Sequence, residues 1–385
     1  MQYKLYGMPG SLYTGKVRSY LIKQGIDFDN RAVGEPRFRS EILGQIGRWI
    51  IPVVETPDGT LVQDGSEIID WFEAKGLARL PTLPTTPRHQ IISQIFELFG
   101  GEGMLRPAMH YRWNFDATNL DFLAKDFVAA LAPGASDEDA AGVFGFSSSR
   151  MRKAMTSFGV TPDSIPKIEA AYEQFLDLFN AHLAHSPYLL GGRPTLGDYG
   201  LIAPLFAHLG RDPYPSALMK RRAPRVWRWV ERMHSAGQDA GDYGSPAPDL
   251  FADDAVPETL KALLAFIAED YLPEIAAMVG YTNDWLGSRP DIVPGTNGLE
   301  RSSERTIGQV ELVWRGLPIK VAVLPYRLYL LQKAQDVADG CDARGKAAIE
   351  ALLAETGLSS LLSLKTSRRV ERQNHLEVWG PVIGA

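Results

Sequence analysis

Polar side chains stand at several points where a strand-like run ends and a helix-like pattern begins. The first is Ser11, within the stretch MPGSLYTGKVR. A serine at such a position can cap the helix that follows it. Its hydroxyl can also donate a hydrogen bond to a thiolate, which a helix N-terminus stabilises. Both roles stay open for Ser11, and Tyr6 and Tyr13 are rival donors for the second role.

A second candidate position opens the run DGSEIIDWFE, where Asp64 and Glu67 form a D-x-x-E capping box. A helix N-terminus offers free N–H groups and a positive dipole end to a carboxylate. An acidic side chain beside it can pair with an ammonium group. The run therefore predicts a helix cap, and also a subsite for a group that carries both charges, with Gly65 or Ser66 contributing.

The third candidate is the Ile51-Pro52 pair, which lies inside the apolar run 50–55. A proline inside a strand removes a ladder hydrogen bond. A cis bond before Pro52 turns the backbone of Ile51 outward, so that its N–H and C=O can pair with a peptide-like ligand. An ordinary bulge or edge position is the alternative. Arg48 lies close by, either as a partner for an anionic ligand group or as a solvated surface arginine.

These residues need a scaffold, and the first 76 positions predict one of mixed strands and helices. The expected strands are residues 3–8, 28–33, 50–55 and 60–62, and the expected helices are 17–24, 37–44 and 64–75. This β-α-β-α-β-β-α order predicts an α/β thioredoxin-like domain over residues 1–80. In a domain with this order of elements, we expect the peptide bond before Pro52 to be cis.

The middle of the chain predicts an all-helical domain over residues 88–236. Pro81, Pro84 and Pro87 mark a linker before it. Apolar stripes at helical spacing follow in residues 90–98, 120–131, 165–184, 196–209 and 226–234. The acidic, Gly/Ser-rich stretch 132–149 predicts a loop.

A second boundary is expected at residues 236–248, and residues 249–385 predict an α+β extension of unknown role. Its expected elements are a helix over 257–285 broken at Pro273, a hairpin of 309–314 with 317–323, and helices at 326–338 and 345–355.

Composition limits the classes of function. Lys and Arg number 40 against 46 Asp and Glu, a formal net charge of −6, which disfavours a broad nucleic-acid or anionic-membrane surface. The single cysteine, Cys341, excludes an intrachain disulfide, and Thr14 leaves no C-x-x-C after Ser11. No uncharged apolar run approaches the roughly 18 residues of a membrane span, so we expect a cytoplasmic protein. No metal site is predicted.

Four features, in order, make roughly the first 235 residues resemble the cytosolic glutathione transferase family. They are Ser11 ahead of its helix, the Ile51-Pro52-Val53 run, the DGSEIIDWFE helix start, and YLLGGRPTLGD followed by RVWRWVERM. The Thr195-x-x-Asp198 part of the fourth feature predicts a structural capping box.

The resemblance implies that glutathione is a cosubstrate, that its thiolate attacks a small apolar electrophile, and that the chain forms a homodimer. Ser11 or Tyr6 is then the catalytic hydroxyl. The glutathione contacts it implies are Ile51, Pro52, Asp64, Gly65, Ser66 and Arg48. The electrophile pocket it implies is walled by Met109, His110, Tyr111 and Trp113, for which core packing is the competing interpretation.

Two residues depart from the family pattern. Gly65 stands where a serine hydroxyl is usual, and Ile50 stands where a lysine often holds the glycine carboxylate. These departures, with the long extension, favour an alternative: a non-catalytic binding protein on the same fold. A third hypothesis is that another thiol or acidic ligand replaces glutathione. Fold analogy does not decide among them.

Overall fold

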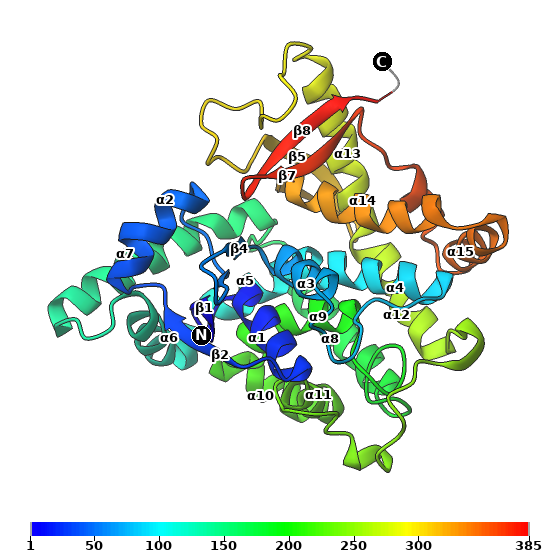
Figure 1. Ribbon diagram of the computed structural model, residues 1–385, viewed down its shortest axis with the longest axis horizontal. Coiled ribbons are helices and arrows are strands. Elements are labelled where there is room, and N and C mark those ends of the chain that lie inside the picture. Colours follow the sequence, from blue (N-terminus) through cyan, green and yellow to red (C-terminus); the bar gives the residue numbers. More distant parts are fainter. Residues whose placement is uncertain (1, 384–385) are drawn as a thin grey trace.

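The computed structural model describes residues 2–383, and its N-terminal domain is built on a mixed four-stranded sheet of order β2-β1-β3-β4 (Figure 1). The strands are β1 (Tyr3–Gly7), β2 (Phe28–Ala32), β3 (Val53–Glu55) and β4 (Leu61–Gln63). β1 is parallel to β2 and antiparallel to β3. The predicted thioredoxin-like arrangement is confirmed.

Alternation along the strands assigns each sheet face to different helices. Leu5 and Val54 belong to the core shared with α1 (Leu12–Gln24) and α3 (Gly65–Ala74). Tyr6 and Val53 belong to a smaller core beneath η1 (Phe38–Ile42) and α2 (Leu43–Ile46). Side chains of neighbouring residues in β1 therefore serve opposite faces.

The second domain is helical, as predicted. Its elements are α4 (Pro87–Leu98), η2 (Phe99–Gly103), α5 (Leu105–Trp113), α6 (Asp116–Leu131), α7 (Asp137–Ala154), η3 (Met155–Phe158), α8 (Ile165–His182), α9 (Leu196–Ala207), α10 (Pro213–Arg222) and α11 (Pro224–Met233). The capping box of Thr195 and Asp198 is present at the start of α9, where both side chains are buried. No helix in residues 2–383 is long and apolar enough to cross a membrane.

One expectation for this domain is wrong. Residues 132–149 are not all loop, because α7 begins at Asp137 with Ser136 as its N-cap. Three acidic residues lie in the first turn of α7 and two basic residues in its last turn, which complements the helix dipole. Only one residue of α7, Ser148, is buried. A helix held by caps and charges lacks the apolar stripe on which the prediction depended.

The C-terminal segment, residues 249–383, contains helices and two hairpins. Its elements are α12 (Glu258–Asp270), α13 (Leu272–Gly287), β5 (Gly308–Trp314), β6 (Leu317–Val323), α14 (Pro325–Gly340), α15 (Ala343–Glu355), β7 (Arg368–Gln373) and β8 (Leu376–Val382); three short turns of helix, η4 (Gly241–Tyr243), η5 (Ala252–Asp254) and η6 (Ser359–Ser363), lie before and within it. The predicted break is confirmed: Tyr271 separates α12 from α13, and Pro273 lies in the first turn of α13. The β7–β8 hairpin was not predicted. Its turn holds Asn374 and His375 at positive φ without a glycine.

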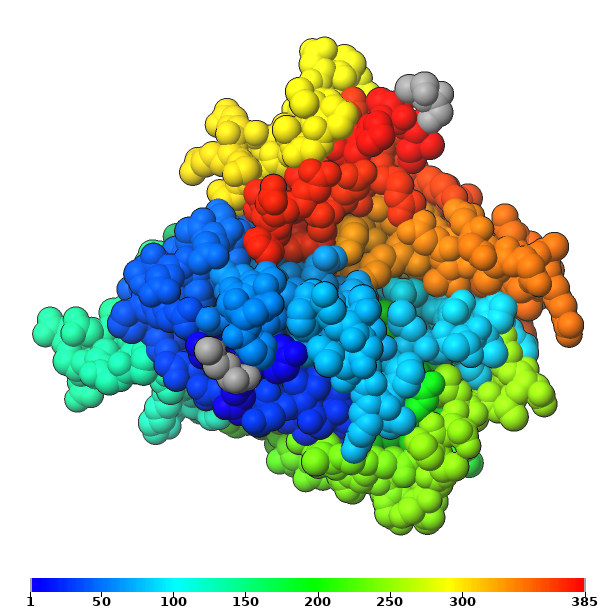
Figure 2. Space-filling view, viewed as in Figure 1, coloured from blue at the N-terminus to red at the C-terminus, as the bar shows by residue number. Residues whose placement is uncertain are grey.

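The C-terminal segment packs directly on the first two domains. α14 lies along α4, and Tyr329 and Lys333 of α14 bond to Glu67 and Asp70 of α3. The β7–β8 hairpin reaches the N-terminal domain in the space-filling view, where its red surface meets the blue one (Figure 2). One hydrophobic core runs through all three regions. The expected domain limits at 1–80, 88–236 and 249–385 stay predictions.

A buried ion pair joins the helices that lead into the candidate site. Lys16 of α1 bonds to Glu97 of α4, and both side chains are almost fully excluded from solvent. Ser66, at the start of α3, also bonds to Glu97 and lies 3.3 Å from the Lys16 Nζ. A carboxylate buried in this way needs a cation and hydrogen bonds close by.

The first prediction concerns this pair. Lys16→Met leaves the Glu97 charge buried without its cation, so we expect a loss of roughly 3–5 kcal/mol in the free energy of unfolding. The double variant K16M/E97L removes both charges and should recover much of that loss. Lys125→Met, which breaks an exposed pair with Asp121, is the control and should cost less than about 1 kcal/mol. Urea denaturation followed by circular dichroism measures all three, and equal losses for K16M and K125M would contradict the prediction.

Candidate functional site

The N-termini of α1 and α3 converge with the segment before β3. Ser11 is the N-cap of α1: its Oγ accepts the Thr14 N–H at 3.4 Å, and its side chain is half-buried. Within residues 2–383, the Ser11 hydroxyl proton has no acceptor. The predicted cap is confirmed, and the hydroxyl still has a hydrogen bond to donate.

Asp64 is the N-cap of α3, as predicted, and only one of its carboxylate oxygens is engaged. Oδ1 accepts the N–H groups of Ser66 and Glu67, at 2.9 and 3.3 Å, and the Tyr326 hydroxyl at 2.9 Å. Oδ2 makes no hydrogen bond with the described residues. The Asp64 backbone has a φ of 91°, outside the usual range for a residue with a side chain. Such conformations cluster at ligand sites.

The Ile51-Pro52 bond is cis, as expected for the thioredoxin-like order. The carbonyl of Pro52 accepts the Asp64 N–H at 3.3 Å, which ties this segment to the start of α3. The N–H and C=O of Ile51 have no hydrogen-bond partner in the described chain, and Ile51 is half-buried. A donor and an acceptor are thus available in the arrangement that a peptide backbone matches.

Gly65 and Ser66 contribute differently from what the sequence suggests. The Ser66 hydroxyl is fully buried and bonds to Glu97, so it does not replace the hydroxyl that Gly65 lacks. A Cβ on Gly65 would lie 3.3 Å from the Lys16 Cδ, a tight contact that glycine avoids. Of the first three N–H groups of α3, those of Ser66 and Glu67 bond to Asp64. The Gly65 N–H has no acceptor in residues 2–383.

The rival hydroxyls are already engaged. Tyr6 donates to the Glu55 Oε2 at 3.1 Å on the sheet face away from α1. Burial and the neighbouring Glu55 raise the pKa of Tyr6 to about 12. Tyr13 donates to the Glu102 Oε1 at 2.6 Å, and burial together with Glu102 raises its pKa well above the ordinary value. Of the three hydroxyls, only that of Ser11 keeps a free donor.

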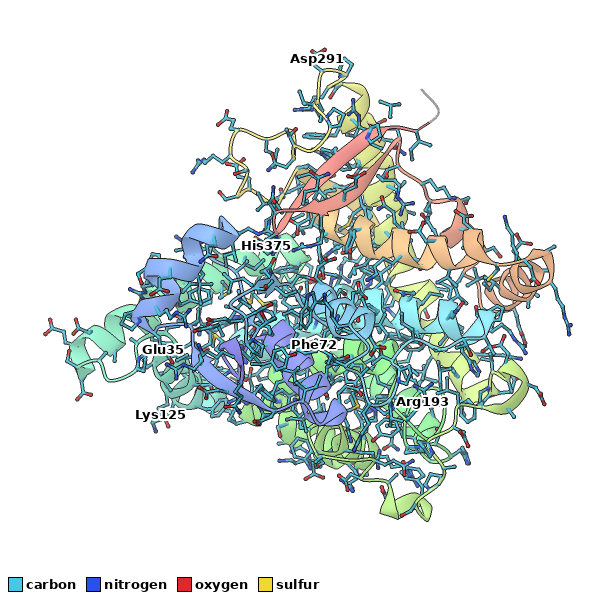
Figure 3. All side chains as sticks on the ribbon, viewed as in Figure 1. Glu35, Phe72, Lys125, Arg193, Asp291 and His375 are labelled. Carbon is cyan, nitrogen blue, oxygen red and sulfur yellow. The ribbon has the colours of Figure 1, made fainter. Side chains whose placement is uncertain are left out.

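Arg48 is not the solvated surface arginine of one expectation, and its contact with a ligand stays a prediction. Its two Nη atoms bond to Glu377 of β8 at 2.7 and 2.8 Å, and the arginine is buried. Burial by itself would raise the pKa of Glu377, but the Arg48 hydrogen bonds and the charges of Arg305 and Arg372 outweigh it and lower that pKa to about 2. Arg48 therefore holds the C-terminal hairpin on the N-terminal domain. Figure 3 labels His375, which lies at the tip of this hairpin.

The C-terminal segment adds residues to the site that sequence reasoning missed. Tyr326 bonds to Asp64, and Arg372 donates to Gln63 at 2.8 Å and to Glu377. Because Tyr326 and Asp64 are 262 residues apart, and Arg372 and Gln63 are 309 apart, no local pattern reveals these contacts. A weak signal exists in α14, where Tyr326, Tyr329 and Lys333 share one helical face.

The four residues expected to wall an electrophile pocket are all buried in packing contacts of the helical domain. His110 lies 3.0 Å from Glu169 of α8 and 2.8 Å from the Asn114 amide. Tyr111 packs among aromatic rings, Trp113 against Phe127, and Met109 is buried in the core. The packing interpretation accounts for all four, and their contact with substrate stays a prediction.

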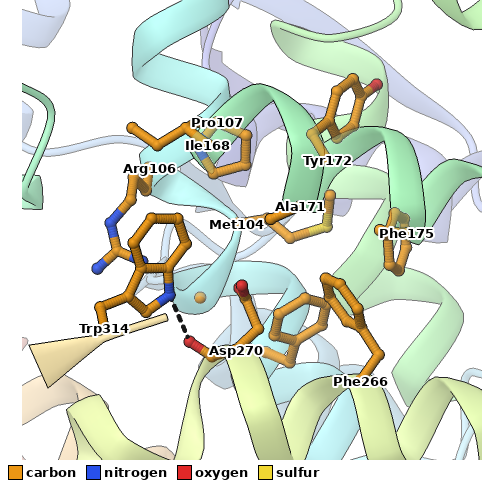
Figure 4. A pocket seen from close by; sticks show the side chains of 12 residues that line it. Met104, Arg106, Pro107, Ile168, Ala171, Tyr172, Phe175, Phe266, Asp270 and Trp314 are labelled. Atoms are coloured by element: carbon orange, nitrogen blue, oxygen red, sulfur yellow. Dashed lines mark hydrogen bonds between the residues drawn. The ribbon is translucent and has the colours of Figure 1, made fainter. Parts of the chain in front are cut away.

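A small cavity does lie against the start of α5, and both the helical domain and the C-terminal segment line it (Figure 4). The helical domain contributes Met104, Arg106 and Pro107 to its wall, and the C-terminal segment contributes Asp270 and Trp314. The Trp314 indole donates to the carbonyl of Asp270 at 2.9 Å. The cavity volume is about 10 Å³, the space of roughly one water molecule.

Comparison with known proteins agrees with this architecture. Residues 5–76 match the glutathione S-transferase N-terminal domain, and residues 162–232 match the glutathione S-transferase C-terminal domain. Models of both domains of that family thus match parts of the chain, and the C-terminal extension lies outside both matches. A comparison with curated proteins gave no match.

Solved structures similar to the chain include glutathione S-transferases and a beta-etherase. One from Xanthobacter autotrophicus Py2 shares 22% identity, with 60% of this chain and 92% of that chain covered and a TM-score of 0.34. A beta-etherase from Sphingobium sp. strain SYK-6 shares 17%, with 64% and 100% covered and a TM-score of 0.44. One from Methylobacterium radiotolerans, in complex with glutathione sulfonate, shares 18%, with 66% and 100% covered and a TM-score of 0.36. At these TM-scores the structures add no argument about the site.

The second prediction uses the lowered pKa of Glu377. A carboxylate whose folded pKa lies below its unfolded value of about 4.3 stabilises the fold above that value and loses the effect as pH falls toward the folded pKa. We expect the stability advantage of the wild type over Glu377→Gln to be constant above about pH 5 and to shrink between about pH 4.3 and 2. Urea midpoints across this range measure it. An advantage that does not change with pH would show that the ion pair is not formed.

Proposed function

We propose that the protein binds glutathione and activates its thiol for attack on a small apolar electrophile. One observation carries this proposal: unengaged polar groups of Ser11, Ile51 and Asp64 remain where α1, α3 and the segment before β3 converge. Buried or half-buried polar groups normally have partners. Three residues with unpaired polar groups in one place indicate that a ligand supplies the missing hydrogen-bond partners.

The chemistry of glutathione matches these groups from one end to the other. In this proposal Asp64 Oδ2 accepts from the γ-glutamyl ammonium, and the Gly65 N–H at the positive end of α3 donates to the adjacent carboxylate. The Ile51 N–H and C=O pair with the peptide backbone of the cysteine. This assignment leaves the thiol for Ser11 at the start of α1.

Ser11 acts on the thiol through electrostatics and keeps its own proton. Its hydroxyl donates a hydrogen bond to the sulfur, and the N-terminus of α1 adds a positive partial charge. Both favour the thiolate, whose ordinary thiol pKa is about 8.5. The thiol proton leaves to solvent, the thiolate forms a bond to the electrophilic carbon, and the leaving group departs with its electron pair. Addition to a double bond begins from the same thiolate.

A second candidate function, ligand binding without turnover, is favoured by the closed cavity at α5. The cavity at α5, which Trp314 helps to line, is only about 10 Å³ and too small for an electrophile, and Tyr326 already occupies one oxygen of Asp64. In this alternative the C-terminal segment closes the site, and Ser11 is only a helix cap. Cytoplasmic location and a homodimer remain proposals that accompany either function.

The third prediction separates these functions through Ser11→Ala. We expect the variant to bind glutathione within about threefold of the wild type and to turn over an aryl halide about 100-fold more slowly, because an oxyanion-type donor is lost. The ultraviolet absorbance of the thiolate should show a raised pKa of the bound thiol. Ser136→Ala is a matched control, since it removes the N-cap of α7 and leaves the site intact.

Each result has a distinct meaning. A wild type that does not bind glutathione in calorimetric titration overturns the proposed function. Binding with no turnover by the wild type establishes the non-catalytic alternative. Equal turnover by S11A and the wild type removes Ser11 from catalysis.

The fourth prediction concerns Asp64→Asn. Asparagine keeps an oxygen for the helix cap but carries no charge for an ammonium group. We expect glutathione affinity to fall about 10- to 100-fold, as for the loss of a charge-assisted hydrogen bond. Thermal unfolding without ligand should change little. A large loss of stability with unchanged relative affinity would show that Asp64 serves the helix alone.

A further inference from the structure

Arg305 brings a cation from the C-terminal segment to the candidate site. It lies in the loop between α13 and β5, and its guanidinium carbon is 5.9 Å from the centre of the Tyr326 ring. The Tyr326 hydroxyl in turn bonds to Asp64. Arg305 also shares a cavity of about 10 Å³ with Glu377 and Trp379. This places Arg305 beside Tyr326, the residue that bonds to the Asp64 cap.

The guanidinium of Arg305 has no hydrogen bond to any residue in the described chain, and its Nε is buried. Three carboxylates act on it electrostatically, those of Glu377, Glu102 and Asp64. A buried donor left without a partner is costly, so such a group in a folded protein calls for an explanation.

Each of those three carboxylates already has other donors. Both oxygens of Glu377 accept from Arg48 or Arg372, and both oxygens of Glu102 accept from Tyr13 or Arg327. Asp64 accepts from Tyr326 and its own helix on Oδ1 and makes no hydrogen bond with Arg305. The N–H groups of Arg305 are therefore open to an acceptor that comes from outside the chain.

We propose that Arg305 binds a carboxylate of the peptide ligand, so that the C-terminal segment supplies the cation that Ile50 does not. A guanidinium offers paired N–H donors whose geometry fits a carboxylate. The assignment rests on the proposed function, because glutathione is the ligand that brings carboxylates to this place. It makes the C-terminal segment part of the binding site and explains why Arg305 is left unpaired without ligand.

Thermal unfolding without ligand tests the unpaired state by itself. Arg372 is the matched control, because it is a neighbouring arginine that does make hydrogen bonds, to Gln63 and Glu377. We expect Arg305→Met to lower the melting temperature by clearly less than Arg372→Met. Equal losses would show that Arg305 is a structural cation and would overturn the assignment. This comparison does not depend on whether glutathione binds.

Calorimetric titration with glutathione and its diethyl ester tests the ligand contact. The ester blocks both carboxylates and keeps the thiol and the ammonium group. We expect Arg305→Gln to lower affinity for glutathione about 10- to 100-fold and to leave affinity for the diethyl ester unchanged. Arg305→Lys should recover part of the loss, since it keeps the charge without the paired donors.

The monoethyl ester, blocked at the glycine carboxylate, identifies the carboxylate concerned. If R305Q and the wild type bind it equally, the partner is the glycine carboxylate; if R305Q is still weaker, it is the γ-glutamyl carboxylate. Equal losses by R305Q for glutathione and the diethyl ester, or no loss for either, would overturn the proposal. If the wild type binds neither ligand, the proposed function is contradicted instead. The comparison of melting temperatures then decides whether Arg305 is an unpaired or a structural cation.

Discussion

The buried carboxylate of Glu97 fixes the relative positions of the two helix N-termini that form the candidate site. It accepts from Lys16 of α1 and Ser66 of α3, and it lies on α4 of the other domain. A buried charge tolerates little displacement of its partners, because separation leaves it unpaired in a medium of low dielectric. The distance between Ser11 and Asp64 depends on this junction. It also explains Gly65, since glycine leaves room for the Lys16 side chain.

The C-terminal segment contributes further contacts to the same site. Arg48 and Glu377 join the hairpin to the N-terminal domain, and Tyr326 places a hydroxyl on the α3 cap. Ser11 and Ile51 remain half-buried, so the site keeps contact with solvent on that side. A ligand bound there lies between the N-terminal domain and the C-terminal segment, and its affinity reports on both. Under the proposed function, this dependence distinguishes the chain from a protein that binds glutathione with its first domain alone.

The sequence predicted the N-terminal fold well, because strand alternation, turn residues and caps are local signals. The caps at Ser11 and Asp64 were read from neighbouring residues and lie where expected. α7 was missed because its stability comes from end charges, which leave no apolar stripe. The buried pair of Arg48 with Glu377 was not predicted, since the two residues are 329 positions apart. Ser66, Tyr326 and Arg305 have roles that only the packing of distant segments reveals.

Hydrogen exchange with and without glutathione tests most directly whether the ligand lies between the N-terminal domain and the C-terminal segment. The measurement follows backbone amides at 51–67 on one side and at 305–307, 326–329 and 372–377 on the other. We predict that glutathione slows exchange on both sides. Slowing confined to 51–67 would contradict the assignment of the C-terminal segment to the site, and no slowing on either side would contradict the site itself.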